Sequence, residues 1–265
     1  MVPLFQRPYV WKQSEQWEPL WADIVSVANR MMTAGDNRQG VKPHFIGAIV
    51  LDAINTPTGH LETRLIIDGQ QRLTTTQLLF EAFADICAEQ RLEKHHRALV
   101  KLTRNDDPMS ENPDEVFKVW PTVVDQDHFR KVMHSTSPAA LKTSYNCETE
   151  ADSVGHPLAD GYLFFHAVLT EWLSIGQPGF EKRVEMLYET LRDKLRMVVI
   201  ELHEEDDAQV IFETLNARGT PLLPSDLVKN FLFHRAQREG KNVQQLYDTY
   251  WKAFDAQDNY WREKL

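Results

Sequence analysis

Apolar residues recur at helical spacing along most of the chain, so the sequence predicts a mainly helical protein. The first stripe includes Trp17, Trp21 and Ile24 and predicts a helix from about Ser14 to Met32. The same pattern predicts further helices at Gly69 or Gln70 to about Glu89, Asp125 to Met133, Leu158 to Ile175, Phe180 to Leu195, Ala208 to Leu215, Ser225 to Arg238 and Val243 to Phe254.

Four short apolar runs interrupt the helical pattern and predict strands. Phe45 to Leu51 and Leu61 to Ile67 flank the turn residues Asn55 to Gly59, which predicts a β-hairpin. Met197 to Leu202 is rich in β-branched residues and is expected to return to the same sheet. Val116 to Trp120 is expected to form a short strand. The predicted fold class is therefore α+β, with a predominantly helical second half.

One stretch of the chain differs in composition from the rest. From about Ser135 to Gly155 the residues become polar and small, which is typical of a mobile linker or lid. We therefore expect one domain at 1–135, a linker or lid at 136–155 and a helical domain at 156–265.

The charge balance limits the classes of partner. The 265 residues carry a formal net charge of -10, so any contact with nucleic acid must come from a local basic cluster. Cys87 and Cys147 lie far apart and outside any Cys-x-x-Cys pair, which gives no support to a disulfide framework or a zinc site. No apolar stretch reaches the roughly 20 residues of a membrane span. A cytoplasmic location without membrane contact is expected.

The most informative segment runs from Ile66 to Thr75, where an apolar strand gives way to a polar turn and then to an amphipathic helix. A helix N-terminus offers unpaired N–H groups and a partial positive charge to an anion. Gly69 allows close approach of a ligand, and Arg72 adds a guanidinium that binds phosphate. Asp68 is placed to hold a metal-bound water or a ribose hydroxyl, and Gln70 and Gln71 to orient a water or a phosphate oxygen.

A purely structural interpretation of the same turn stays open. Asp68 and Gln71 have the spacing of a capping box, in which two side chains satisfy the free N–H groups of a helix start without any ligand. That interpretation leaves Gly69 unexplained, because glycine at a first helical position costs up to about 1 kcal/mol relative to alanine.

The N-terminal segment from Pro3 to Trp11 is the second candidate. Its prolines favour an extended backbone, and Gln6, Arg7, Tyr9 and Trp11 supply hydrogen bonds and flat rings at close spacing. Such a strip could stack on a base and hold a phosphate. The alternative is an edge strand that packs its aromatic residues into the core and pairs its arginine with a carboxylate.

The third candidate runs from Phe212 to Asn230. Asn216, Arg218, Lys229 and Asn230 place two cations and two amides around a helix–loop–helix corner, which could form a second wall for a polyanion. The alternative is a plain helix connector, since Asn216 ends one helix and Ser225 caps the next.

Taken together, these segments resemble the N-terminal domain of the GmrSD-type, modification-dependent restriction family, which includes SspE-like phosphorothioate-sensing proteins. The resemblance covers most of the chain, weakly between about 90 and 200, and rests on four motifs: Phe5 to Trp11, His44 to Leu51, Ile67 to Thr75 and Phe212 to Asn230. It implies a small ParB-like mixed sheet, related to sulfiredoxin, at 1–135. Sulfiredoxin carries a cysteine in the corresponding turn, whereas this chain has Gln70 and Gln71, so sulfinic-acid repair is not expected.

The resemblance also assigns roles to individual residues. It implies hydrolysis of a nucleoside triphosphate with Mg²⁺ at the turn, with guanine as the preferred base and Asp68 as the metal ligand. The residues implied to be catalytic are Asp68, Gln70, Gln71 and Arg72. The residues implied to bind the nucleotide are Gly69, Arg72, Thr74, Asn216, Arg218 and Lys229, with Asp226 on the far wall. The residues implied to sense the DNA modification are Phe5, Gln6, Arg7, Tyr9 and Trp11.

The implied function is a nucleoside-triphosphate-hydrolysing sensor in a restriction system that defends against phage. Its expected partners are modified DNA, a C-terminal or separate His-Asn-His nuclease domain, and a second copy of the chain. No His-Asn-His motif precedes Leu265, so we expect an excised or truncated sensor domain without a nuclease site. Two other functions stay open, namely a non-catalytic module that binds modified DNA and signals to a nuclease, and a protein-interaction scaffold.

Overall fold

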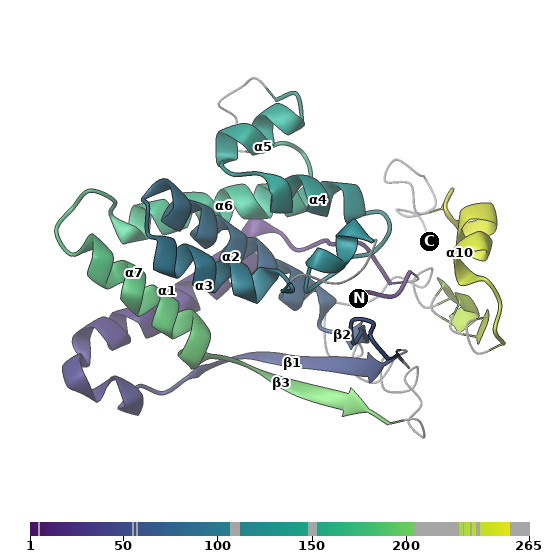
Figure 1. Ribbon diagram of the computed structural model, residues 1–265, viewed down its shortest axis with the longest axis horizontal. Helices are drawn as coiled ribbons and strands as arrows, with labels where there is room; N and C mark the ends of the chain where they lie inside the picture. The colour runs from purple at the N-terminus through teal and green to yellow at the C-terminus, as the bar shows by residue number, and fades with distance from the viewer. Residues whose placement is uncertain are drawn as a thin grey trace.

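A three-stranded sheet lies beside a larger group of helices in the computed structural model (Figure 1). The structure describes residues 1–4, 6–54, 56, 58–106, 112–147, 153–203, 228–229, 231–233, 235–236 and 239–254. The helices and helical turns are η1 (Gln13–Trp17), α1 (Glu18–Thr33), η2 (Gly35–Gly40), α2 (Gln70–Glu89), α3 (Glu93–Thr103), η3 (Pro113–Val116), α4 (Gln126–His134), α5 (Pro138–Ser144), α6 (Pro157–Leu173), α7 (Phe180–Glu189), η4 (Thr190–Lys194), α10 (Val243–Leu246) and η5 (Tyr247–Trp251).

The sheet confirms the predicted hairpin and returning strand. β1 (His44–Ala53) lies in the middle, antiparallel to β2 (Arg64–Asp68) and parallel to β3 (Leu195–Leu202). β1 precedes α2 in the chain and β3 follows α7 (Figure 1). The parallel pairing of β1 with β3 therefore joins the segments that lie before and after these helices. The fold class is α+β with a mixed sheet, as predicted.

One local prediction is wrong. Val116 to Trp120 is no strand: η3 ends at Val116, and Phe117 forms one isolated bridge with Arg104. The aromatic rings decide this geometry, because Phe117 stacks on Trp120 with ring centroids 5.7 Å apart and so turns into the core. The predicted linker contains α5, whose Leu141 is fully buried.

The remaining helix predictions fall into two groups. Those from Ser14 to Leu195 are confirmed within a few residues, and Val243 to Phe254 is helical as α10 and η5 as far as Trp251. Ala208 to Leu215 lies outside the described residues, and of Ser225 to Arg238 the structure describes helical backbone at 228–229, 231–233 and 235–236. Among the described helices, none combines the length and apolar character that a membrane crossing requires.

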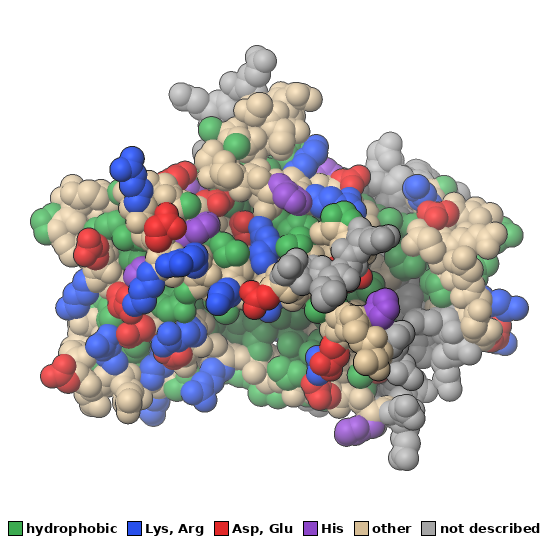
Figure 2. Space-filling view, in the orientation of Figure 1, with side chains coloured by type: hydrophobic (Ala, Val, Ile, Leu, Met, Phe, Trp, Pro, Cys, Tyr) green, Lys and Arg blue, Asp and Glu red, His purple; other side chains and the backbone are tan. Residues whose placement is uncertain are grey.

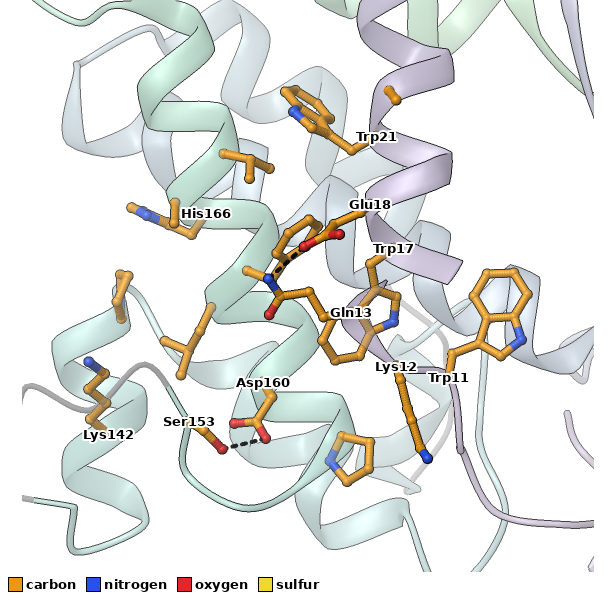
Figure 3. Close-up of a pocket in the computed structure, with 17 residues that line it drawn as sticks. Trp11, Lys12, Gln13, Trp17, Glu18, Trp21, Lys142, Ser153, Asp160 and His166 are labelled. Atoms are coloured by element: carbon orange, nitrogen blue, oxygen red, sulfur yellow. Dashed lines mark hydrogen bonds between the residues drawn. The ribbon is translucent and has the colours of Figure 1, made fainter. Parts of the chain in front are cut away.

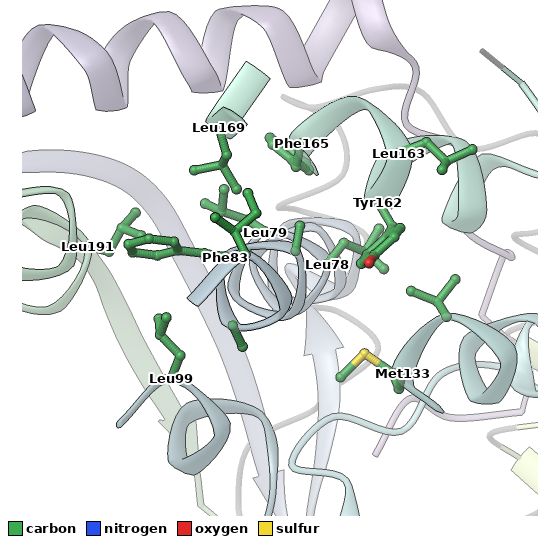
Figure 4. Packing of buried hydrophobic residues seen from close by; sticks show 14 of the residues in the cluster. Leu78, Leu79, Phe83, Leu99, Met133, Tyr162, Leu163, Phe165, Leu169 and Leu191 are labelled. Carbon is green, nitrogen blue, oxygen red and sulfur yellow. The ribbon is translucent and has the colours of Figure 1, made fainter. Parts of the chain in front are cut away.

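Helix α2 forms the centre of the core. Its apolar residues Leu78, Leu79, Phe83 and Ile86 are fully buried, and α3 and α6 pack on either side of it (Figure 4). One apolar cluster extends from Tyr9 to Leu191 and includes residues on both sides of the predicted linker. The division into two domains stays a prediction.

Polar groups buried in this core pair with each other. Arg104 binds both carboxylate oxygens of Glu81, at 2.9 and 2.7 Å. The hydroxyl of Tyr162 donates to Asp85 at 2.6 Å, and burial raises the pKa of Asp85 to about 7. These pairs join α2 to α6 and to the end of α3.

His156 is the N-cap of α6, and its side chain is buried and only partly satisfied. Its Nδ1 accepts from the amide of Leu158 at 3.3 Å, whereas its buried Nε2 has no hydrogen-bond partner. Its ring stacks on His128 with centroids 3.5 Å apart. Burial, together with His128 and Lys131, lowers the pKa of His156 to about 3.

We predict that His156 makes the protein less stable in acid. Between about pH 6.5 and 3 the unfolded state binds a proton at His156 that the folded state does not, so stability falls as pH decreases through this window. Asp85 works in the opposite direction, since its pKa is raised. His156→Asn replaces the capping acceptor Nδ1 by an amide oxygen and removes the titrating ring. The urea-unfolding free energy of the variant should therefore decrease less than that of the wild type between pH 7 and 4.5, and the two slopes should differ by under about 1.4 kcal/mol per pH unit.

The exposed His60 supplies the matched control for this experiment. His60→Asn should keep the wild-type pH dependence. An identical pH dependence in wild type and His156→Asn would show that His156 does not couple folding to protons.

Candidate functional site

The corner where β2 meets α2 has the geometry of an anion site. Gly69 is the N-cap of α2, with φ at 87°, a region that favours glycine. A Cβ on Gly69 would lie 2.6 Å from Cγ2 of Ile49, so glycine is required for space as well as for conformation. The glycine is thus a cap and not, as the sequence suggested, the first helical residue.

The predicted capping box is not formed. Helix α2 has no side-chain cap, because the side-chain amide of Gln71 binds the backbone of Pro8 and Val10 instead of the start of the helix. Among the described residues, no acceptor binds the backbone N–H groups of Gln70, Gln71 and Arg72. The carboxylate of Asp68 likewise has no hydrogen bond or ion pair within the described chain. A 20-residue helix therefore begins with free donors beside a free carboxylate.

Arg72 lies across β1 at the same corner. Its Nη1 donates to the carbonyl oxygen of Ala48, and it forms no ion pair with any described residue. Its guanidinium rests on Gly47, where a Cβ would lie 2.7 Å from Cζ. The sequence analysis gave Gly47 no role, although an isolated glycine inside a strand indicates a bulge or a close approach. Gly47 lies where the β1–β3 register shifts, between Phe45 and Ala48.

Glutamines join the N-terminal segment to this corner. Gln6 donates to the carbonyl oxygens of Ile66 and Ile67 at 2.6 and 2.9 Å. Gln70 donates to the carbonyl oxygen of Arg7 at 2.8 Å. Two of the sequence motifs are thereby in direct contact.

Gln71 completes the attachment. Its amide nitrogen donates to the carbonyl oxygen of Pro8 at 2.9 Å, and its amide oxygen accepts from the backbone of Val10 at 2.8 Å. Gln71 is 7% exposed and Gln6 is 4% exposed, so both are internal connectors.

Tyr9 anchors the segment from the other side. Its hydroxyl lies 2.6 Å from Oγ1 of Thr75 and accepts from Nε1 of Trp17 at 2.8 Å. Its backbone amide donates to Asp125, another residue to which the sequence analysis gave no site role. Burial raises the pKa of Tyr9 above its usual range, so it is a neutral structural hydroxyl.

The other predicted site residues are distributed more widely. Thr74 is buried within α2, and Arg7 is half-buried. Lys229 is buried with its Nζ 5.2 Å from the ring centroid of Tyr247, which belongs to a separate apolar cluster. Phe5, Asn216, Arg218, Asp226 and Asn230 lie outside the described residues.

The side chain of Trp11 takes no part in the hydrogen bonds that Gln6 and Tyr9 form among the described residues. It lines a groove together with Trp17 and Trp21, beside α6 (Figure 3). The structure therefore separates Trp11 from Gln6 and Tyr9, whose polar atoms bind inside the protein.

The described residues contain no group of three His, Cys, Asp or Glu side chains that could hold a metal ion. Mg²⁺ needs no such group, since it is commonly bound by one or two carboxylates together with phosphate oxygens and water. The unpartnered carboxylate of Asp68 fits that pattern.

Charge is mixed on the surface. On the face shown in Figure 2, basic and acidic side chains of the described residues are interspersed, and neither sign forms an extended patch.

We predict that Gln71 stabilises the fold through the N-terminal segment. Gln71→Ala leaves the buried Pro8 carbonyl and Val10 amide without partners, which should lower the free energy of unfolding by about 2–4 kcal/mol. Urea unfolding followed by tryptophan fluorescence measures it. The exposed Gln39 provides the control, and Gln39→Ala should change stability by less than about 0.5 kcal/mol. A Gln71→Ala protein as stable as that control would contradict the anchoring role.

Comparison with known families places this site in context. A model of the GmrSD restriction endonuclease N-terminal domain matches residues 1–233, which span the sheet, α2 and the N-terminal segment. No curated protein matches the chain. The family is one of modification-dependent DNA restriction proteins, and the match covers well over half of the sequence. The chain therefore belongs to the GmrSD restriction endonuclease N-terminal domain family.

Proposed function

We propose that the β2–α2 corner binds the phosphates of a nucleoside triphosphate, and that hydrolysis of this triphosphate regulates a DNA nuclease module. One observation carries the proposal: at this corner three backbone amides and the Asp68 carboxylate lack partners in the described chain, and Arg72 has one hydrogen bond. Groups that a fold leaves unsatisfied at one place are suited to a ligand.

The groups proposed to hold the phosphates are backbone amides and one guanidinium. The amides of Gln70, Gln71 and Arg72 point from the N-terminal end of α2, where the helix dipole favours an anion. The guanidinium of Arg72 has donors left after its bond to Ala48, and a fork of this kind suits phosphate oxygens. These groups would stabilise the negative charge of the reacting phosphate without rearrangement.

Asp68 is the proposed Mg²⁺ ligand. When bound, the ion would neutralise phosphate charge. Asp68 would otherwise accept a hydrogen bond from the attacking water. The chain holds this carboxylate at the last position of β2, opposite Val50, so its backbone is fixed by the sheet.

The contacts refine the roles of the glutamines. Gln70 and Gln71 were expected to orient water or phosphate, but their side-chain amides bind the backbone of Arg7, Pro8 and Val10. We therefore propose that they position the corner and that Asp68 and Arg72 act on the ligand. Asn216 and Arg218 remain proposed residues of the far wall.

The same contacts suggest how DNA would control hydrolysis. The N-terminal segment is proposed to sense the modification, phosphorothioate being the example in the family, and Arg7 is its proposed DNA contact. Because Gln6 and Gln70 bond this segment to the corner, a displacement of the segment changes the position of the corner. A ParB-like nucleotide-binding core and a preference for GTP are parts of this proposal.

We predict that Arg72→Ala lowers triphosphatase activity by about a hundredfold or more, because it removes a charge that stabilises the transition state. Phosphate release is measured with each ribonucleoside triphosphate and Mg²⁺, with and without modified DNA. Arg97→Ala is the control, since Arg97 is an exposed arginine on α3.

Two outcomes would oppose the proposal. Wild-type turnover by Arg72→Ala would remove the assigned role. Binding of modified DNA by a wild-type protein that hydrolyses none of the four nucleotides would favour the non-catalytic module instead.

A further inference from the structure

A second candidate site is a groove between the start of α1, α5 and α6 (Figure 3). Its volume is about 840 Å³, within the range of ligand sites in proteins. Aromatic rings line it: Trp11, Trp17, Trp21 and Phe164. Trp11, Trp21 and Phe164 are half-buried, so parts of their rings are accessible.

The acidic side chains of the groove have hydrogen-bond partners in the protein, and its lysines do not. Glu18 accepts from Nε2 of Gln13 at 2.9 Å. Asp160 accepts from the hydroxyl of Ser153 and from the amide of Val154, at 2.8 and 2.7 Å. The groove's acidic side chains thus have partners from the protein.

The basic side chains differ. Among the described residues, the ammonium groups of Lys12 and Lys142 have no hydrogen bond and no ion pair. Lys12 precedes η1 and Lys142 belongs to α5, so the two approach the groove from different elements (Figure 3). The groove therefore offers two ammonium groups with unused donors beside accessible aromatic faces, while the formal charges of Lys12 and Lys142 are balanced by those of Glu18 and Asp160.

We propose that this groove binds unpaired nucleotides of DNA. A nucleobase would stack on Trp11 or Trp21, and the neighbouring phosphates would pair with Lys12 and Lys142. Stacking on aromatic rings and ion pairing with lysines are the two interactions by which proteins hold single strands. The two carboxylates already accept hydrogen bonds from neutral groups of the protein, whereas the two ammonium groups have no acceptor, so an incoming phosphate finds unused donors. An apolar peptide would leave both lysines unused.

The proposal goes beyond nucleotide hydrolysis and does not require it. The groove is nevertheless connected to the corner: Trp11 follows Val10, whose amide binds Gln71, and Trp17 donates to the hydroxyl of Tyr9. Occupation of the groove would thus act on the segment that holds the corner in place.

Fluorescence anisotropy with a labelled oligothymidylate tests the charges. Lys12→Gln combined with Lys142→Gln should weaken binding about tenfold or more, and should make the slope of log affinity against log salt shallower by about 1.4, that is about 0.7 for each phosphate left without its lysine. The control combines Lys101→Gln and Lys182→Gln, which remove the same charge from exposed positions on α3 and α7. It should bind as wild type does.

The rings are tested separately. Trp21→Ala should weaken binding by about 5- to 150-fold because a stacking surface is removed, whereas Trp21→Phe should retain most of the affinity. Unfolding measurements on both variants identify any loss of fold, and the lysine variants test the groove independently of it.

Competition experiments distinguish a single strand from a mononucleotide and from duplex DNA as the ligand of the groove. Unlabelled oligothymidylate should displace the probe, and thymidine monophosphate or duplex of matched length should do so only at much higher concentration. Equal competition by the mononucleotide or the duplex would overturn the proposal. So would undetectable binding of the single strand, or equal affinity for the groove and control lysine variants. No nucleoside triphosphate is present in these assays, so loss of hydrolysis in Arg72→Ala leaves the result unaffected.

Discussion

The glycine cap of α2 is the constraint on which the candidate site depends. A serine or aspartate cap would place a side-chain oxygen on the first amides of the helix and satisfy them internally. Gly69 has no side chain and adopts a left-handed conformation, and it lies so close to Ile49 that any Cβ would force a neighbouring group to move. The helix consequently starts against the sheet with its first amides free, and the guanidinium of Arg72 packs on Gly47 beside them.

The second feature of the site is its attachment to the N-terminal segment. The segment has little regular structure, and side chains hold it: Gln6 bonds to the end of β2, Gln71 bonds to Pro8 and Val10, and Tyr9 bonds to Thr75. Such a connection is specific in geometry but depends on few bonds. On the proposed function, this segment would transmit a displacement from the proposed DNA contact to the proposed phosphate site, because both lie on the same short stretch.

Local signals in the sequence were enough to predict much of this arrangement. The strand–glycine–helix order identified the corner, and β-branched residues at Met197 to Leu202 identified the third strand. The bonds of Gln6 and Gln71 had no such signal, because they join side chains to backbone groups about 60 residues away. The capping box failed for the same reason, since Gln71 finds distant partners that its local spacing does not reveal. The strand predicted around Phe117 failed because the sequence does not reveal that Phe117 stacks on Trp120.

The central claim is that the first amides of α2 receive phosphate. Titration of isotope-labelled protein with a non-hydrolysable GTP or ATP analogue and Mg²⁺, followed by nuclear magnetic resonance, observes these amides directly. The account predicts that the amide signals of Gly69, Gln70, Gln71 and Arg72 shift in a saturable way with one dissociation constant. Saturable shifts confined to other parts of the chain, with these four signals unmoved, would contradict it.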